Sequence, residues 1–311
     1  MMRSAIECAG KAGMALAVVM AVSACAVGGA KKETVDGLVI SNPKGLAGKS
    51  DVIVPGFSVS FVQEDRKMAQ ASAGTYSNAS SSTSAKMRGV SKATMQAITD
   101  FAYQDFKKKL VANGYSISDL AAIQATQNAA YQSQTFVSSP QPNTTPYLAY
   151  NNNMEELSFA PSGKKILKAN NGLSYAAAGL DAAIINLNYI VHFGYIGAQS
   201  TETSGYSGTR ASASTQFHPG INVAWYSGLH FLTGINNAWG NPNTHIYLNE
   251  SLFSDQHFGK GSSRSSGGGY GDSFATRDIS LQVDEHKYAA IAKQLLAQAN
   301  DKIIGAMAAR R

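Results

Sequence analysis

The feature that most constrains the fold is a run of alternating side chains in the middle of the 311-residue chain. Apolar residues occupy every second position from Ile185 to Phe193, and the positions between them hold Asn186, Asn188, Ile190 and His192. A period of two places successive side chains on opposite faces of an extended chain, which is typical of a β-strand. The sequence therefore predicts a long strand here.

A second alternating run opens the part of the chain that we expect to be folded. Residues 52–54 are apolar, Pro55-Gly56 interrupts the run, and Phe57, Val59 and Phe61 then alternate with smaller residues. We expect a strand with a kink or bulge at Pro55-Gly56. Turn residues separate further extended segments, which are predicted at 211–217, 221–225, 229–232, 245–252 and 279–283.

Three segments have the three- and four-residue spacing of amphipathic helices. The first begins after the N-cap residue Ser91 and ends before Gly114, the second covers 118–133, and the third runs from an N-cap at Asp284 to about Ala308. The order is then strand, two helices, several strands and a closing helix. This order predicts an α/β or α+β fold, a single sandwich of helices on a mixed, largely antiparallel sheet.

Residues 1–24 have the pattern of a secretory signal peptide. Arg3 and Lys11 precede a mostly apolar stretch that is too short to cross a bilayer as a helix. The stretch ends at Val22-Ser23-Ala24-Cys25, which resembles the lipobox of bacterial lipoproteins: an aliphatic residue, two small ones, and the cysteine that receives lipid. The resemblance implies lipidation at Cys25. The alternative is an ordinary signal-peptidase cut beside an incidental cysteine.

The same resemblance implies a location in the cell envelope. The mature chain would carry fatty chains such as palmitate on Cys25, and Cys8, the other cysteine, would be removed with the signal. Ala26 rather than Asp follows the cysteine, which by the sorting rule of enteric bacteria favours the outer membrane, with the folded part facing the periplasm. The cell surface and the soluble periplasm are the alternatives. No other stretch approaches 18 consecutive apolar residues, so no transmembrane helix is predicted.

The composition of the remaining chain predicts a tether followed by one folded domain. Residues 25–50 are rich in glycine, lysine and small residues, and we expect them to be a flexible tether. Residues 51–311 are long enough for one domain with its own core. Long loops are predicted near 64–90, 138–165 and 259–273, where small and polar residues, prolines or glycines dominate.

The layout is similar to that of the curli-secretion-channel lipoproteins and their holdfast-anchor relatives. In these families a lipidated cysteine also precedes a strand, helices and a second strand that begins with a small residue, an aspartate and a run of apolar residues. Residues 180–185 match this second strand here. They continue with amphipathic hairpins, which here correspond to residues 205–217 and 221–233. A pore-forming role is not favoured, because a hairpin that faces lipid needs an apolar band and Ala211, Ala213 and Thr215 are only weakly apolar.

The sequence contains no recognisable catalytic constellation. Residues 205–208 miss the spacing of a nucleophile elbow, and no phosphate-binding loop occurs. The six histidines do not form the helical pair of zinc proteases, and only Asp255 and His257 are weak candidates for a metal site. We therefore expect no cofactor, and an enzyme is the less favoured class.

Two functions remain open. The first is a non-enzymatic, lipid-anchored envelope protein that acts in assembly, secretion or partner docking, as a homo-oligomer or with another protein. Its candidate contact residues are Trp225, Tyr226, Trp239 and Tyr247. The second is an anchored hydrolase or glycan-binding protein that uses the loops around Trp239, His245, Asp255 and His257. Nucleic acid is not expected as a partner, because the clusters of basic residues at 107–109, 164–168 and 310–311 lack interleaved aromatic residues.

Overall fold

The computed structural model describes residues 32–73, 77–119, 136–147, 152–167, 171–205, 208–235, 243–268 and 273–311. Its helices are η1 (Pro43–Leu46, a 3-10 helix), α1 (Lys92–Ala112), α4 (Asn171–Ala178) and α5 (Glu285–Ala308). Its strands are β1 (Lys32–Val35), β2 (Leu38–Ser41), β3 (Asp51–Ser72), β4 (Asn78–Arg88), β5 (Ser116–Ile117), β6 (Phe136–Val137), β7 (Gln141–Tyr147), β8 (Asn152–Phe159), β9 (Ile166–Leu167), β10 (Ala183–Gly205), β11 (Gly208–Val223), β12 (Gly228–Leu232), β13 (Thr244–Leu248), β14 (Leu252–Ser254), β15 (Gly259–Gly268) and β16 (Ser273–Val283). The signal segment, Cys25 and most of the helix predicted at 118–133 lie outside the described residues.

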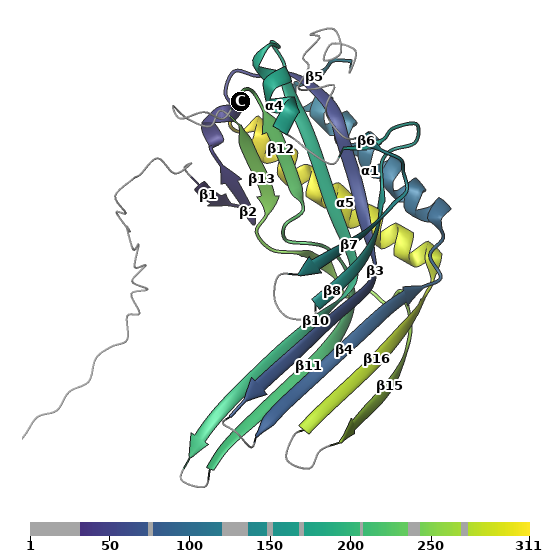
Figure 1. Cartoon of the computed structure of the whole chain (residues 1–311). Coiled ribbons are helices and arrows are strands. Elements are labelled where there is room, and N and C mark those ends of the chain that lie inside the picture. The colour runs from purple at the N-terminus through teal and green to yellow at the C-terminus, as the bar shows by residue number, and fades with distance from the viewer. Residues whose placement is uncertain are drawn as a thin grey trace, which may run out of the picture.

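A mixed sheet of 14 strands organises the described part of the chain (Figure 1). Its main path runs β1-β2-β13-β12-β10-β3-β4-β16-β15, with β3 and β10 parallel at the centre. The long strand predicted around residues 185–193 is confirmed as part of β10. The β3–β10 register shifts where Val54 and Pro55 oppose Ile185 alone, and this bulge confirms the interruption predicted at Pro55-Gly56.

Beside the helices, the sheet is covered on both faces. On one face, Phe57 of β3 packs against Tyr189 of β10 and Phe106 of α1, with ring centroids 6.1 and 5.8 Å apart, and the apolar face of α5 completes this core. On the other face, Ile53 and Ile184 pack with residues of α4. Neighbouring residues of a strand point to opposite faces, so β3 and β10 contribute to both cores.

The two long helices begin where their capping residues predict. The Ser91 hydroxyl accepts a hydrogen bond from the backbone N–H of Thr94 at 3.1 Å, and the Asp284 carboxylate accepts one from Lys287 at 3.2 Å. Gly114 follows α1 with φ of +79°, a left-handed conformation that glycine adopts without the steric penalty of a Cβ atom. Both helices are therefore confirmed at the predicted positions.

Strands β3, β4, β10, β11, β15 and β16 continue well beyond the helices (Figure 1). We call this projecting part the stalk and define it as residues 62–72, 78–88, 192–205, 208–220, 259–268 and 273–283; the remaining described residues are the body. One ribbon of the stalk has the order β3-β4-β16-β15, and the hairpin β10–β11 forms a second ribbon. The Thr215 hydroxyl of β11 lies 2.8 Å from both the Ser81 and the Thr83 hydroxyls of β4, so the two ribbons are packed against each other.

The predicted fold class is wrong. Strands make up 54% of the structure and helices 24%, so the chain is mostly sheet rather than an α/β or α+β sandwich of helices on a sheet. The three described α-helices pack against the body and the base of the stalk, and the rest of the stalk projects beyond them (Figure 1). The error arises because the end of β3, β4 and β15 have few large apolar residues, a composition that predicts loops.

Each of the predicted long loops contains strands. Residues 64–90 hold the end of β3 and all of β4, residues 138–165 hold β7 and β8, and residues 259–273 hold β15 and the start of β16. The described part of the expected tether is also structured: residues 32–46 form β1, β2 and η1, and Leu38 and Ile40 are buried. Hydrogen bonding between β2 and β13 joins this segment to the main sheet.

Candidate functional site

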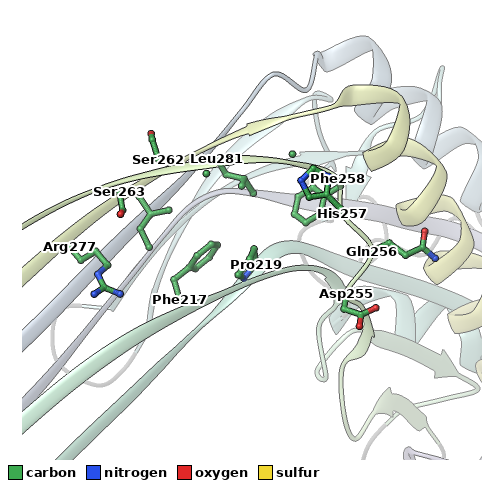
Figure 2. Close-up of a pocket in the computed structure, with 13 residues that line it drawn as sticks. Phe217, Pro219, Asp255, Gln256, His257, Phe258, Ser262, Ser263, Arg277 and Leu281 are labelled. Atoms are coloured by element: carbon green, nitrogen blue, oxygen red, sulfur yellow. The ribbon is translucent and has the colours of Figure 1, made fainter.

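Asp255 and His257, the weak metal candidates, line a common pocket. This pocket has a volume of about 360 Å³ and lies between β11, the segment before β15, and β16 (Figure 2). The two side chains lie at separate places along its wall, with Phe217 and Pro219 opposite them (Figure 2). Over the described ranges, no group of three or more histidine, cysteine, aspartate or glutamate side chains is placed to hold a metal ion.

Of the other two residues of the hydrolase or glycan-binding hypothesis, His245 does not line this pocket. His245 is on β13, where its ring lies 4.3 Å from that of His230 on β12, measured between centroids. Trp239 lies outside the described residues. The structure thus places Asp255 and His257 on the wall of one pocket and His245 elsewhere, on β13.

The His230–His245 pair has an electrostatic consequence. Burial lowers the pKa of His230 to about 4, and the charge of the nearby His245 contributes in the same direction. Burial also lowers the pKa of His245. Because both rings favour the neutral form, the unfolded chain binds protons here that the folded chain does not, and acid should favour unfolding.

We expect the variant His230→Gln to lose part of this acid sensitivity. The imidazole of His230 takes up its proton near pH 6.5 in the unfolded chain but near pH 4 in the folded chain. Its contribution to the free energy of unfolding is therefore complete above pH 6.5 and is lost progressively as the pH falls to 4. Between pH 7 and pH 4, the free energy of unfolding should fall by about 2 to 3 kcal/mol more in the wild type than in the variant. Denaturant unfolding across this range measures the difference. Parallel pH profiles would contradict the assignment.

Three of the four candidate contact residues, Trp225, Tyr226 and Tyr247, lie in the described part of the chain. Trp225 and Tyr226 follow β11 and meet edge to face, with centroids 5.3 Å apart. Both line a second pocket, of about 460 Å³, beside β10 and β11. Tyr247 lies half-buried on β13, opposite Gly228 of β12. Trp225 is 52% exposed, which leaves its ring available to a ligand or partner.

The feature that sequence reasoning missed is the set of open strand edges on the stalk. β15 pairs only with β16 among the described residues, and residues 208–220 of β11 pair only with β10. The side of β10 that pairs with β3 in the body also has no partner strand over residues 192–205 in this part of the structure. Unpaired backbone N–H and C=O groups along such edges are templates for another strand.

Comparison of the chain with protein-family models, with curated proteins and with solved structures finds no match. None of the helices in the described ranges has the length and apolarity needed to span a membrane.

Proposed function

We propose that this protein is a lipid-anchored envelope component that assembles with copies of itself through the edges of its stalk, without catalysing a reaction. The observation that carries the proposal is the pair of ribbons whose outer strands, β11 and β15, have no further partner among the described residues. Natural proteins usually cover, shorten or twist away such long edges, because an open edge pairs with other chains.

The strand directions favour one mode of assembly. β11 runs from the tip of the stalk at Gly208 towards the body, whereas β15 runs from the body to the tip at Gly268 (Figure 1). When two copies stand side by side with their stalks aligned, β11 of one copy is therefore antiparallel to β15 of the next. Contact between two different edges is heterologous, and repetition of such a contact produces a ring or an open chain of subunits.

The composition of the edges suits contact between folded copies rather than uncontrolled aggregation. β15 is exposed along nearly its whole length and is built from glycine and serine with two basic residues, Lys260 and Arg264. Charged and polar edge residues weaken non-specific pairing of strands. Lipid on Cys25, as the lipobox-like residues 22–25 imply, would hold the stalks in a common orientation and raise their local concentration.

Cross-linking of introduced cysteines tests the proposed contact. Because Cys8 and Cys25 are the only natural cysteines, the variant Arg264→Cys/Ser212→Cys places one new thiol on each proposed edge. In isolated membranes, a short bifunctional maleimide should convert this variant into a ladder of covalent dimers, trimers and larger species on a denaturing gel. Each single variant should give no species beyond a dimer.

The matched control moves one thiol to a strand that has neighbours on both sides. In Lys86→Cys/Arg264→Cys, the first thiol is on β4, which lies between β3 and β16, so no ladder is expected. A monomer band alone from the edge variant, or equal ladders from both variants, would contradict assembly through these edges. Adding Cys25→Ala should move the cross-linked material from the membrane to the soluble envelope fraction if the lipid is the anchor.

A further inference from the structure

A pocket of about 460 Å³ lies where the stalk meets the body, at an irregularity in the β10–β11 hairpin. His192 pairs with Asn222 and Gly194 pairs with Pro219, so Gly220 and Ile221 of β11 oppose a single residue of β10. This extra residue is a β-bulge, which turns side chains away from the regular pattern and often accompanies a binding site. His192, Gly194 and Asn222 all line the pocket.

Aromatic rings form much of the pocket wall. Tyr195, Trp225 and Phe253 line it and are 55%, 52% and 51% exposed. The Tyr195 ring stacks on His218 with centroids 6.3 Å apart, and the Lys67 ammonium lies 4.6 Å from the centroid of the Tyr195 ring. Contacts between neighbouring rings hold such side chains in place before a ligand arrives, which lowers the entropy cost of binding.

The pocket also presents a small number of polar groups. Asn222 is only 6% exposed, and its side-chain amide forms no hydrogen bond with any described residue. Burial and the charge of Lys67 lower the pKa of His192 to about 4, so its imidazole is neutral at pH 7 and offers one donor and one acceptor. Asp65 adds a carboxylate, whose pKa burial raises although Lys67 opposes the shift.

We propose that this pocket binds a sugar unit of a glycan, with a face of the ring on Trp225 and its hydroxyl groups towards Asn222, His192 and Asp65. A sugar has an apolar C–H face and an edge of groups that both donate and accept hydrogen bonds. The pocket offers the matching combination of exposed aromatic faces and convergent polar groups, at a size usual for small-molecule sites.

Other ligand classes match the same groups less well. A wholly apolar ligand would leave the nearly buried Asn222 amide without a hydrogen-bond partner, which costs about 1 to 3 kcal/mol. A multiply charged anion would face the Asp65 carboxylate. A quaternary ammonium ion would be repelled by the Lys67 ammonium, which lines the same pocket and already lies against Tyr195.

Tryptophan fluorescence of the full chain tests this proposal. The protein is solubilised in dodecyldimethylamine oxide, a detergent without a sugar headgroup, and is titrated with maltotetraose, cellotetraose and chitotetraose. The chain has two tryptophans, so Trp239→Phe leaves Trp225 as the sole reporter. At least one oligosaccharide should cause a saturable change in emission in this variant, and tetramethylammonium chloride should cause none.

Saturation-transfer NMR on the otherwise wild-type chain provides the second measurement. Trp225→Ala should weaken binding of the active oligosaccharide by about tenfold or more. Phe274→Ala removes an equally exposed ring from β16, outside the pocket, and should leave binding unchanged. Absence of saturable binding of all three sugars, equal binding by Trp225→Ala, or a saturable response to tetramethylammonium alone would overturn the proposal. Because neither measurement depends on oligomer formation, failure here is distinguishable from failure of the proposed assembly.

Discussion

Replacing Asn300 with leucine is expected to lower the free energy of unfolding by about 3 kcal/mol, because the substitution leaves a buried hydroxyl without an acceptor. Asn300 of α5 is fully buried. Its side-chain oxygen accepts a hydrogen bond from the Tyr189 hydroxyl at 2.7 Å, and its amide nitrogen donates to the Ala102 carbonyl and the Asp105 carboxylate at 3.0 and 2.8 Å. The amide thus joins α5 to both α1 and the central strand β10. Chemical denaturation of the purified chain measures the loss.

A double-mutant cycle separates this network from a simple change in packing. Tyr189→Phe alone should cost about 1 to 2 kcal/mol, because it leaves the Asn300 oxygen without its donor. The double variant should lose less stability than the sum of the two single losses, since it removes both polar partners together. Strict additivity would mean that the Tyr189–Asn300 hydrogen bond does not contribute as described.

Gly228→Ala is expected to destabilise the body by about 3 kcal/mol or more, through a clash that side-chain rotation cannot relieve. A Cβ atom at Gly228 would lie 2.3 Å from the Ile246 carbonyl oxygen and 2.6 Å from the Tyr247 Cα atom. Both atoms belong to the backbone of β13. The β12–β13 pairing would therefore have to open, and the thermal unfolding temperature should fall by several degrees or more.

Gly197→Ala is the matched control for this substitution. Gly197 also lies in a strand, but its nearest contacts to an added Cβ are the edge of the Tyr195 ring at 3.5 Å and the Gln216 carbonyl oxygen at 3.8 Å. These are ordinary van der Waals distances, so the change in unfolding free energy should stay within about 1 kcal/mol. A similar loss in both variants would indicate a general effect of removing glycine rather than the clash with β13.

The elements of the body could be predicted because their signals are local. Ser91 caps the start of α1, Gly114 follows its end, and Asp284 caps the start of α5. Each acts through a hydrogen bond or a backbone angle that involves only a few neighbouring residues. Alternation of large apolar residues also identified the parts of β3 and β10 that lie between two cores. Pairing between these strands joins segments more than a hundred residues apart, and no local pattern specifies such a partner.

Residues 211–217 of β11 and 279–283 of β16 were predicted as extended, but the rest of the stalk could not be predicted because its buried positions hold small side chains. The buried face of β4 carries Ala79, Ser81, Thr83 and Ala85, and these alternate with polar residues of similar size. Without a contrast between large apolar and polar residues, a strand has the composition of a loop. β15 lacks even this pattern, since it is exposed along its length and is specified by pairing with β16.

The candidate binding sites were predictable only in part. The aromatic character of Trp225 and Tyr226 indicated contact residues, and the structure places both beside a pocket. His192 appeared as a polar position on a strand, but the sequence does not show that a bulge sets it beside Asn222 and near Asp65. Which strands lie at an edge depends on the order of all strands in the sheet. The open edges of β11 and β15 therefore could not be predicted from local sequence.

The small side chains between the two ribbons also affect the thermodynamics of the stalk. Alanine, serine and threonine bury little apolar area per residue, so the ribbons gain less from removal of water than the body does. Segments of this kind open at a smaller free-energy cost than the global transition. A neighbouring copy would pair only with stalk strands that are already ordered. By mass action, the fraction of chains with an ordered stalk would therefore rise with protomer concentration.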